Sequence, residues 1–69
     1  MNEVDCLGLK CPLPIILMAT ELKTLAVGDC LLLKSDDPAT FPDLLAWSRM
    51  TGNEIEKISE TTFMITKKS

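Results

Sequence analysis

Histidine and tyrosine are both absent from this chain of 69 residues. Without histidine, neither a Ser-His-Asp triad nor a Cys-His pair can form, and no side chain has an ordinary pKa near neutrality. The usual routes of self-contained acid–base catalysis are therefore excluded. What remains is a protein whose chemistry runs through a thiol, or one that has no chemistry of its own.

Long hydrophobic runs are also missing. The longest apolar stretches are only a few residues, which is too short for a transmembrane helix. Residues 1–5 are acidic and lack the basic start and apolar core of a signal peptide. We therefore expect a cytoplasmic protein with no membrane partner.

Positive charge and cysteine are both scarce. Seven Lys and Arg against ten Asp and Glu give a net charge of −3, which argues against direct nucleic-acid binding. The chain has three cysteines, an odd and small number that argues against a disulfide framework. The spacing of Cys6, Cys11 and Cys30 matches no zinc pattern. We expect no metal and no cofactor.

The length allows a single domain, residues 1–69, and we expect a monomer. A chain of this size buries only about 60% of its unfolded surface. Its stability should then be about 3–10 kcal/mol. Because so thin a core leaves little room for an enclosed cavity, any chemistry should lie at the surface.

Hydrophobic periodicity predicts six elements in the order strand, helix, strand, helix, strand, strand. This order predicts an α+β fold: a two-layer βαβαββ sandwich with two helices on one face of a four-stranded mixed sheet. The strand at 30–34 is apolar on both faces, so we place it inside the sheet. The predicted strands are 2–6, 30–34, 54–59 and 62–67, the first helix is 12–25, and the second helix is capped at 37 or at 40 and stops at 51–53.

Apolar residues three and four apart give the first helix one core-facing stripe. Ile16 and Leu17 lie off this stripe, close to Cys11. They form either a docking patch or part of a broad buried helix face. The stripe consists of Ile15, Met18, Ala19, Leu22 and Leu25 or Ala26.

The second helix has two candidate starts. Asp37 can cap it with Pro38 in the first position, or Thr40 can cap it with Asp43 as a capping-box variant. Pro42 favours the second start, because a proline in the first turn loses no hydrogen bond. The core-facing residues are then Phe41, Leu44, Leu45 and Ser48, with Trp47 at the border.

The last two strands form a hairpin that turns near Glu60-Thr61. Phe63 and Ile65 should point to one face of the sheet and Met64 to the other. Ile55 and Ile58 break the alternation of the preceding strand, which predicts a bulge or a register error there.

Cys11-Pro12-Leu13-Pro14 places a thiol immediately before the first helix. The positive end of the helix dipole and the N–H groups of Leu13 and Ile15 should lower the pKa of the Cys11 thiol by up to about 1.5 units. Lys10 should add to this effect. Pro12 should hold the sulfur outward. We therefore predict a reactive Cys11.

Cys6 and Cys30 lie in predicted strands and should be buried apolar residues. A resolving role for Cys6 toward Cys11 is the less favoured reading. A reactive Cys11 can serve as a redox sensor, form a mixed disulfide with a partner, or carry sulfane sulfur. The alternative is a purely structural Cys11 that caps the helix imperfectly.

The segment Asp5-Cys6-Leu7-Gly8-Leu9-Lys10-Cys11-Pro12-Leu13-Pro14 resembles the signature of the TusA/SirA family of small sulfur carriers. That signature has an Asp, a Gly three residues later and then Cys-Pro-x-Pro. Gly28-Asp29 and Asp36-Asp37-Pro38-Ala39-Thr40 resemble later segments of the family. The resemblance implies the βαβαββ fold. It also implies that Cys11 is the persulfide-carrying residue, with support from Asp5, Gly8, Lys10, Pro12 and Pro14.

The resemblance further implies protein partners: a sulfur donor such as a cysteine desulfurase, and a sulfur-acceptor protein. One route known in the family leads to 2-thiouridine in tRNA, and others serve molybdenum-cofactor maturation, sulfur oxidation or thiosulfate use. Such a protein is a sulfurtransferase-type carrier rather than a self-contained catalyst. Asn53, where many members have His, and the short connection at Glu60-Thr61 are departures that bear on the pathway. A thiol redox or regulatory protein-binding module remains the alternative.

Overall fold

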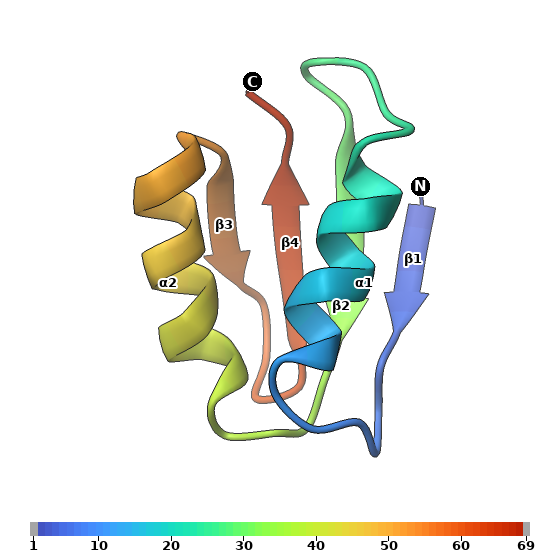
Figure 1. Cartoon of the computed structure of the whole chain (residues 1–69). Coiled ribbons are helices and arrows are strands. Elements are labelled where there is room, and N and C mark those ends of the chain that lie inside the picture. Colours follow the sequence, from blue (N-terminus) through green and yellow to red (C-terminus); the bar gives the residue numbers. More distant parts are fainter. Residues whose placement is uncertain (1, 69) are drawn as a thin grey trace.

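The computed structural model of the protein describes residues 2–68 as two helices packed on one side of a four-stranded sheet (Figure 1). The predicted two-layer α+β architecture is confirmed. Within the described residues, neither helix is long and apolar enough to cross a membrane. The elements are β1 (Asn2–Asp5), α1 (Leu13–Leu22), β2 (Cys30–Lys34), α2 (Thr40–Thr51), β3 (Glu54–Lys57) and β4 (Thr62–Thr66).

The strands lie in the order β1-β2-β4-β3, so β2 is an interior strand as predicted. β1 and β2 are parallel neighbours, and α1 connects them. β4 lies antiparallel between β2 and β3. The sheet is therefore mixed, as predicted.

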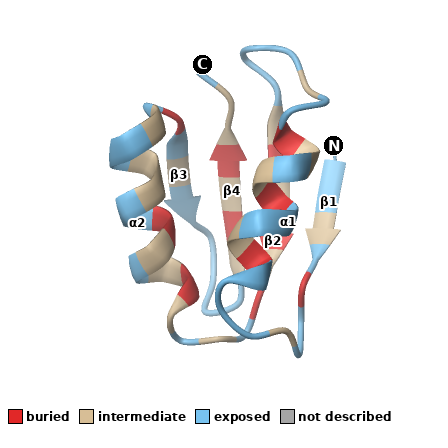
Figure 2. Cartoon of the chain, viewed as in Figure 1, coloured by how far each residue is buried: buried red, intermediate tan, exposed pale blue. Residues whose placement is uncertain are grey.

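The core lies between the helices and one face of the two central strands. Leu31 is paired with Ile65 and Leu33 with Phe63, and all four side chains are buried. Figure 2 shows buried residues on β2, on β4 and on the helix sides that face them. Met64 points to the opposite face, so the predicted alternation in β4 is confirmed. The helices contribute Met18, Leu22 and Leu44 to this core.

Helix α1 is shorter than the predicted span of 12–25. It starts after Pro12 and ends at Leu22, because the following residues form turns with the Thr24 N–H bonded to the Glu21 carbonyl. Leu25 still packs against the core from this turn. The predicted core-facing stripe is confirmed for Met18 and Leu22, which are both buried.

Helix α2 begins at Thr40, but not with the predicted capping box. The Thr40 hydroxyl lies 2.6 Å from the Ser35 hydroxyl in a buried contact, so it does not cap the helix. Asp37 instead accepts the Ala39 N–H in the turn before the helix. Leu45 is 39% exposed and not a core residue, which corrects the prediction. Gly52 ends the helix with a φ of 79°, which favours glycine.

The hairpin contains no bulge, contrary to prediction. Ile55 pairs with Ile65 and Lys57 with Phe63 in unbroken register. Ile58 lies beyond β3, where its N–H donates to the Thr62 carbonyl in the turn. The alternation fails at Ile58 because the strand ends there.

Leu33→Ala should destabilise the fold by about 2–5 kcal/mol, because it leaves a cavity where a fully buried side chain packed. Leu32→Ala, in the same strand but on the half-exposed face, is the matched control and should lose about 1 kcal/mol. Urea unfolding of the native chain and both variants measures the difference. Equal losses in the two variants would contradict this placement of the core.

Candidate functional site

Two loops meet at one edge of the sheet because β1 and β2 are parallel neighbours (Figure 1). One loop connects β1 to α1 and carries Cys11, and the other connects β2 to α2. The pairing extends one residue past β1, where the Cys6 N–H donates to the Lys34 carbonyl at 2.7 Å. The sheet therefore brings residues from distant parts of the sequence to the thiol.

The loop before Cys11 is held by hydrogen bonds at Asp5 and Gly8. A carboxylate oxygen of Asp5 accepts the Leu7 N–H at 3.1 Å. Gly8 has a φ of 83°, a conformation that residues with a side chain rarely adopt. Its N–H donates to a carboxylate oxygen of Asp36 at 3.0 Å, which ties the two loops together.

The Cys11 side chain is exposed and bound to an acid on α2. Its Sγ donates to the Asp43 Oδ2 at 2.7 Å. Its backbone N–H donates to the Asp37 Oδ2 at 2.6 Å. Two carboxylates therefore hold this residue, one at the sulfur and one at the main chain.

These carboxylates reverse the predicted effect on acidity. The pKa of the Cys11 thiol is raised, first by the hydrogen bond to Asp43, then by desolvation and by the negative charges of Asp43 and Asp37. One of the predicted donors, the Leu13 N–H, donates to the Lys10 carbonyl instead, and the N-cap residue Pro12 has no N–H. The prediction of a lowered pKa was wrong.

Lys10 acts on Asp37 instead of the thiol. The pKa of the Asp37 carboxyl is lowered by the N–H groups of Ala39 and Cys11, and then by the Lys10 charge.

The peptide bond between Cys11 and Pro12 is cis, and Pro12 is exposed. Pro14 is buried. Of the two prolines, Pro12 therefore lies at the surface and Pro14 is buried.

The other two cysteines are less accessible, and all three are free thiols. Cys6 is fully buried, and its pKa is raised by burial and by the Asp5 charge. The Cys30 sulfur is half-buried and lies 3.3 Å from the Thr66 hydroxyl. Burial of Cys6 is confirmed and disfavours a resolving role for it, whereas the prediction that Cys30 is buried was wrong, because this residue is only half-buried.

An apolar patch on α1 follows the thiol along the chain. We call Leu13, Ile16 and Leu17 the α1 patch; their exposed fractions are 46%, 51% and 41%. The alternative that Ile16 and Leu17 belong to a broad buried face is therefore wrong. Exposed apolar side chains that gather beside a thiol are typical of a protein-binding surface.

Asp36, Asp37 and Asp43 lie at the site, although the sequence analysis treated Asp37 and Asp43 as helix-cap candidates and placed Asp36 and Asp37 only in a segment that resembles the family. Asp37 and Asp43 are separated from Cys11 by 26 and 32 residues. The available signal was the parallel βαβ order, since the ends of neighbouring parallel strands share one edge.

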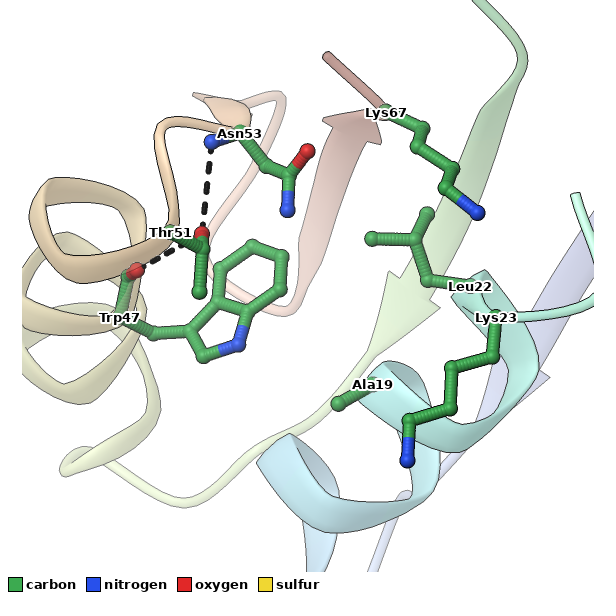
Figure 3. A pocket seen from close by; sticks show the side chains of 7 residues that line it. All are labelled: Ala19, Leu22, Lys23, Trp47, Thr51, Asn53 and Lys67. Carbon is green, nitrogen blue, oxygen red and sulfur yellow. Dashed lines mark hydrogen bonds between the residues drawn. The ribbon is translucent and has the colours of Figure 1, made fainter. Parts of the chain in front are cut away.

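A separate cavity of about 370 Å³ lies between the C-terminal halves of the two helices (Figure 3). Its rim includes Lys67, whose ammonium group donates to the Leu25 carbonyl at 2.7 Å. No thiol or carboxylate is among the residues that line it. The lining residues are Ala19, Leu22, Lys23, Trp47, Thr51, Asn53 and Lys67.

The sequence profile of the family described as sulfurtransferase TusA matches residues 2–67. The chain belongs to the TusA family. It is 36% identical over 59 residues to the sulfur carrier protein TusA of Allochromatium vinosum, covering 86% of this chain and 78% of that protein. A solved SirA-like protein from Desulfitobacterium hafniense shares the fold with a TM-score of 0.82 at 23% identity, over the full length of both chains. The resemblance is confirmed, and TusA is a sulfur-carrier family.

In this TusA-family chain, Asp37→Asn should destabilise the fold most at neutral pH. A carboxyl whose pKa is lowered by folding stabilises the native state above its ordinary value of 3.8, and that contribution is lost as the pH falls through its lower folded value. The gap in unfolding free energy between native and variant should therefore close below pH 3.8. Urea unfolding across the pH range measures it. A gap independent of pH would contradict the assignment, and Glu56→Gln, on an exposed position of β3, controls for the loss of one charge.

Proposed function

We propose that this protein carries sulfane sulfur as a persulfide on Cys11 and passes it between protein partners. The observation that carries the proposal is the exposed thiol of Cys11 at the start of α1, inside the segment that matches the sulfur-carrier family. The loop between β1 and α1, which is bonded to Asp36 through Gly8, holds this sulfur at the surface, where another protein's sulfur can reach it.

The transfer steps balance without an added oxidant or reductant. In loading, the Cys11 sulfur attacks the terminal sulfur of a donor persulfide, such as that of a cysteine desulfurase. The new S–S bond forms as the donor's S–S bond breaks, and the donor leaves as a thiol with the proton that Cys11 lost. Delivery repeats the exchange with an acceptor thiol. Formation of 2-thiouridine in tRNA is one destination for such a relay.

The α1 patch is the surface on which we expect the sulfur donor to dock. The donor's persulfide must approach the exposed sulfur, and Leu13 lies two residues from Cys11 on the helix that follows it. Ile16 and Leu17 continue the apolar surface along α1. The carboxylates of Asp37 and Asp43 beside this patch favour a donor with basic residues around an apolar centre.

One observation favours a second candidate function. The raised pKa of Cys11 leaves little thiolate at neutral pH, which fits a regulatory protein-binding module that transfers no sulfur, whereas a redox-sensing thiol needs a lowered pKa. A carrier in thiosulfate or sulfur metabolism without a tRNA role is a variant of the first proposal. Loading of sulfur on Cys11 separates carrier from module.

Cys11→Ser should abolish loading. The native chain, incubated with a cysteine desulfurase and cysteine, should gain the mass of one sulfur atom, because its exposed thiol is the acceptor. Cys30→Ser is the matched control, since that sulfur is half-buried, and it should load like the native chain. Intact-mass spectrometry measures the adduct. An adduct that persists in Cys11→Ser, or its absence from the native chain, would overturn the proposal.

Ile16→Ser should slow loading from the desulfurase but leave loading from a small-molecule persulfide unchanged. The kcat/KM with the protein donor should fall about five- to tenfold, the size of one interface contact. Val27→Ser, 66% exposed and beyond the other end of α1, is the control. Equal kcat/KM values for the native chain and Ile16→Ser would argue against docking at the α1 patch.

A further inference from the structure

We propose that Asp43 is a positioning residue that biases Cys11 toward giving sulfur away, by holding the unloaded sulfur as a thiol. This inference rests on the proposed carrier function and assigns the carboxylate a role that depends on whether sulfur is bound. The observation behind it is the contact between the Cys11 Sγ and the Asp43 Oδ2 at 2.7 Å.

Both partners of this contact are held in place. Asp43 is half-buried in the first turn of α2, and its N–H donates to the Ala39 carbonyl at 3.1 Å. The Cys11 backbone is fixed by the Asp37 Oδ2, and Asp37 is fixed in turn by the Ala39 N–H at 3.0 Å. The sulfur and the carboxylate are therefore in contact, and each side chain extends from a backbone segment that hydrogen bonds hold in place.

The hydrogen bond requires a proton on Sγ, and only the unloaded thiol has one there. In the persulfide, Sγ is bonded to the terminal sulfur about 2.05 Å away and carries no proton. The same contact then sets sulfur lone pairs against a carboxylate. Asp43 thus stabilises the unloaded thiol relative to the persulfide, and relative to the thiolate.

The surrounding charges act in the same direction. Asp37 and Asp43 are the carboxylates that act on the sulfur, and both raise its pKa. Asp36 lies on the facing loop and binds the Gly8 N–H. The nearest cation in sequence, Lys10, acts on Asp37. An anion at Cys11, whether thiolate or ionised persulfide, is therefore disfavoured.

Asp43→Asn tests the proposal, because the amide keeps the size of the side chain and can donate a hydrogen bond to sulfur. Each protein is equilibrated with mixtures of glutathione persulfide and glutathione, and peptide-resolved mass spectrometry gives the loaded fraction of Cys11. The equilibrium constant for loading should rise about three- to tenfold, the range of one exposed hydrogen bond. Glu56→Gln removes the same charge from an exposed position of β3 and should leave the constant unchanged.

The alkylation rate of Cys11 with iodoacetamide gives a second readout. Its rise with pH should occur at lower pH in Asp43→Asn than in the native chain, and Glu56→Gln should follow the native chain. Equal loading constants and equal pH profiles in native and Asp43→Asn would overturn this inference and leave the carrier function standing. A native chain that takes up no sulfur on Cys11 would overturn the carrier function itself.

Circular dichroism checks that Asp43→Asn folds. If the variant does not fold, the native chain alone tests the inference. The pH midpoint for alkylation of Cys11 should be higher in the folded native chain than in the urea-unfolded chain. A midpoint equal to or below that of the unfolded chain would overturn the inference.

Discussion

The parallel pairing of β1 with β2 is the constraint on which the site depends. Because parallel neighbours end at the same edge, the loop with Cys11 and the loop with Asp36 and Asp37 emerge side by side. The register from Asn2 opposite Leu31 to Asp5 opposite Lys34 sets how far each loop projects. An antiparallel β1 would send the Cys11 loop to the opposite edge, away from all three acids.

Local patterns in the sequence located the six elements and most of the core, but not the exact ends of the elements. The spacing of Met18 and Leu22 located the buried face of α1, and the alternation of Phe63 and Ile65 located the buried face of β4. The exposed Cys11 also follows from local features. The contacts of its sulfur do not, because Asp43 lies 32 residues away and reaches the site only through the packing of α2. A bulge or a register error was predicted at Ile55 and Ile58 for a related reason: periodicity does not show that the strand stops at Lys57.

The acidity of Cys11 shows why direct contacts outweigh the helix dipole here. The dipole effect falls off within the first turn and is about 0.3–1 kcal/mol at an exposed site. Cys11 precedes the N-cap, and Pro12 has no N–H to offer it. A carboxylate in hydrogen-bond contact acts on the sulfur itself, and it favours the protonated form. The sign of the shift is therefore decided by a residue of the second helix.

A thiol that stays protonated at neutral pH suits a chain that contains no histidine. A strongly activated sulfur on an exposed loop would react with any oxidant or electrophile that it met. Pairing with a carboxylate lowers that reactivity, and in the carrier role that we propose it also favours delivery of the sulfur, because delivery restores the hydrogen-bonded thiol. In the carrier role that we propose, the donor enzyme is the partner that can take the thiol proton during loading, because the chain has no histidine and Asp43 favours the protonated thiol. Under the same proposal, dependence on the partner's base contributes to specificity, because a protein that docks without a base takes up the thiol proton poorly.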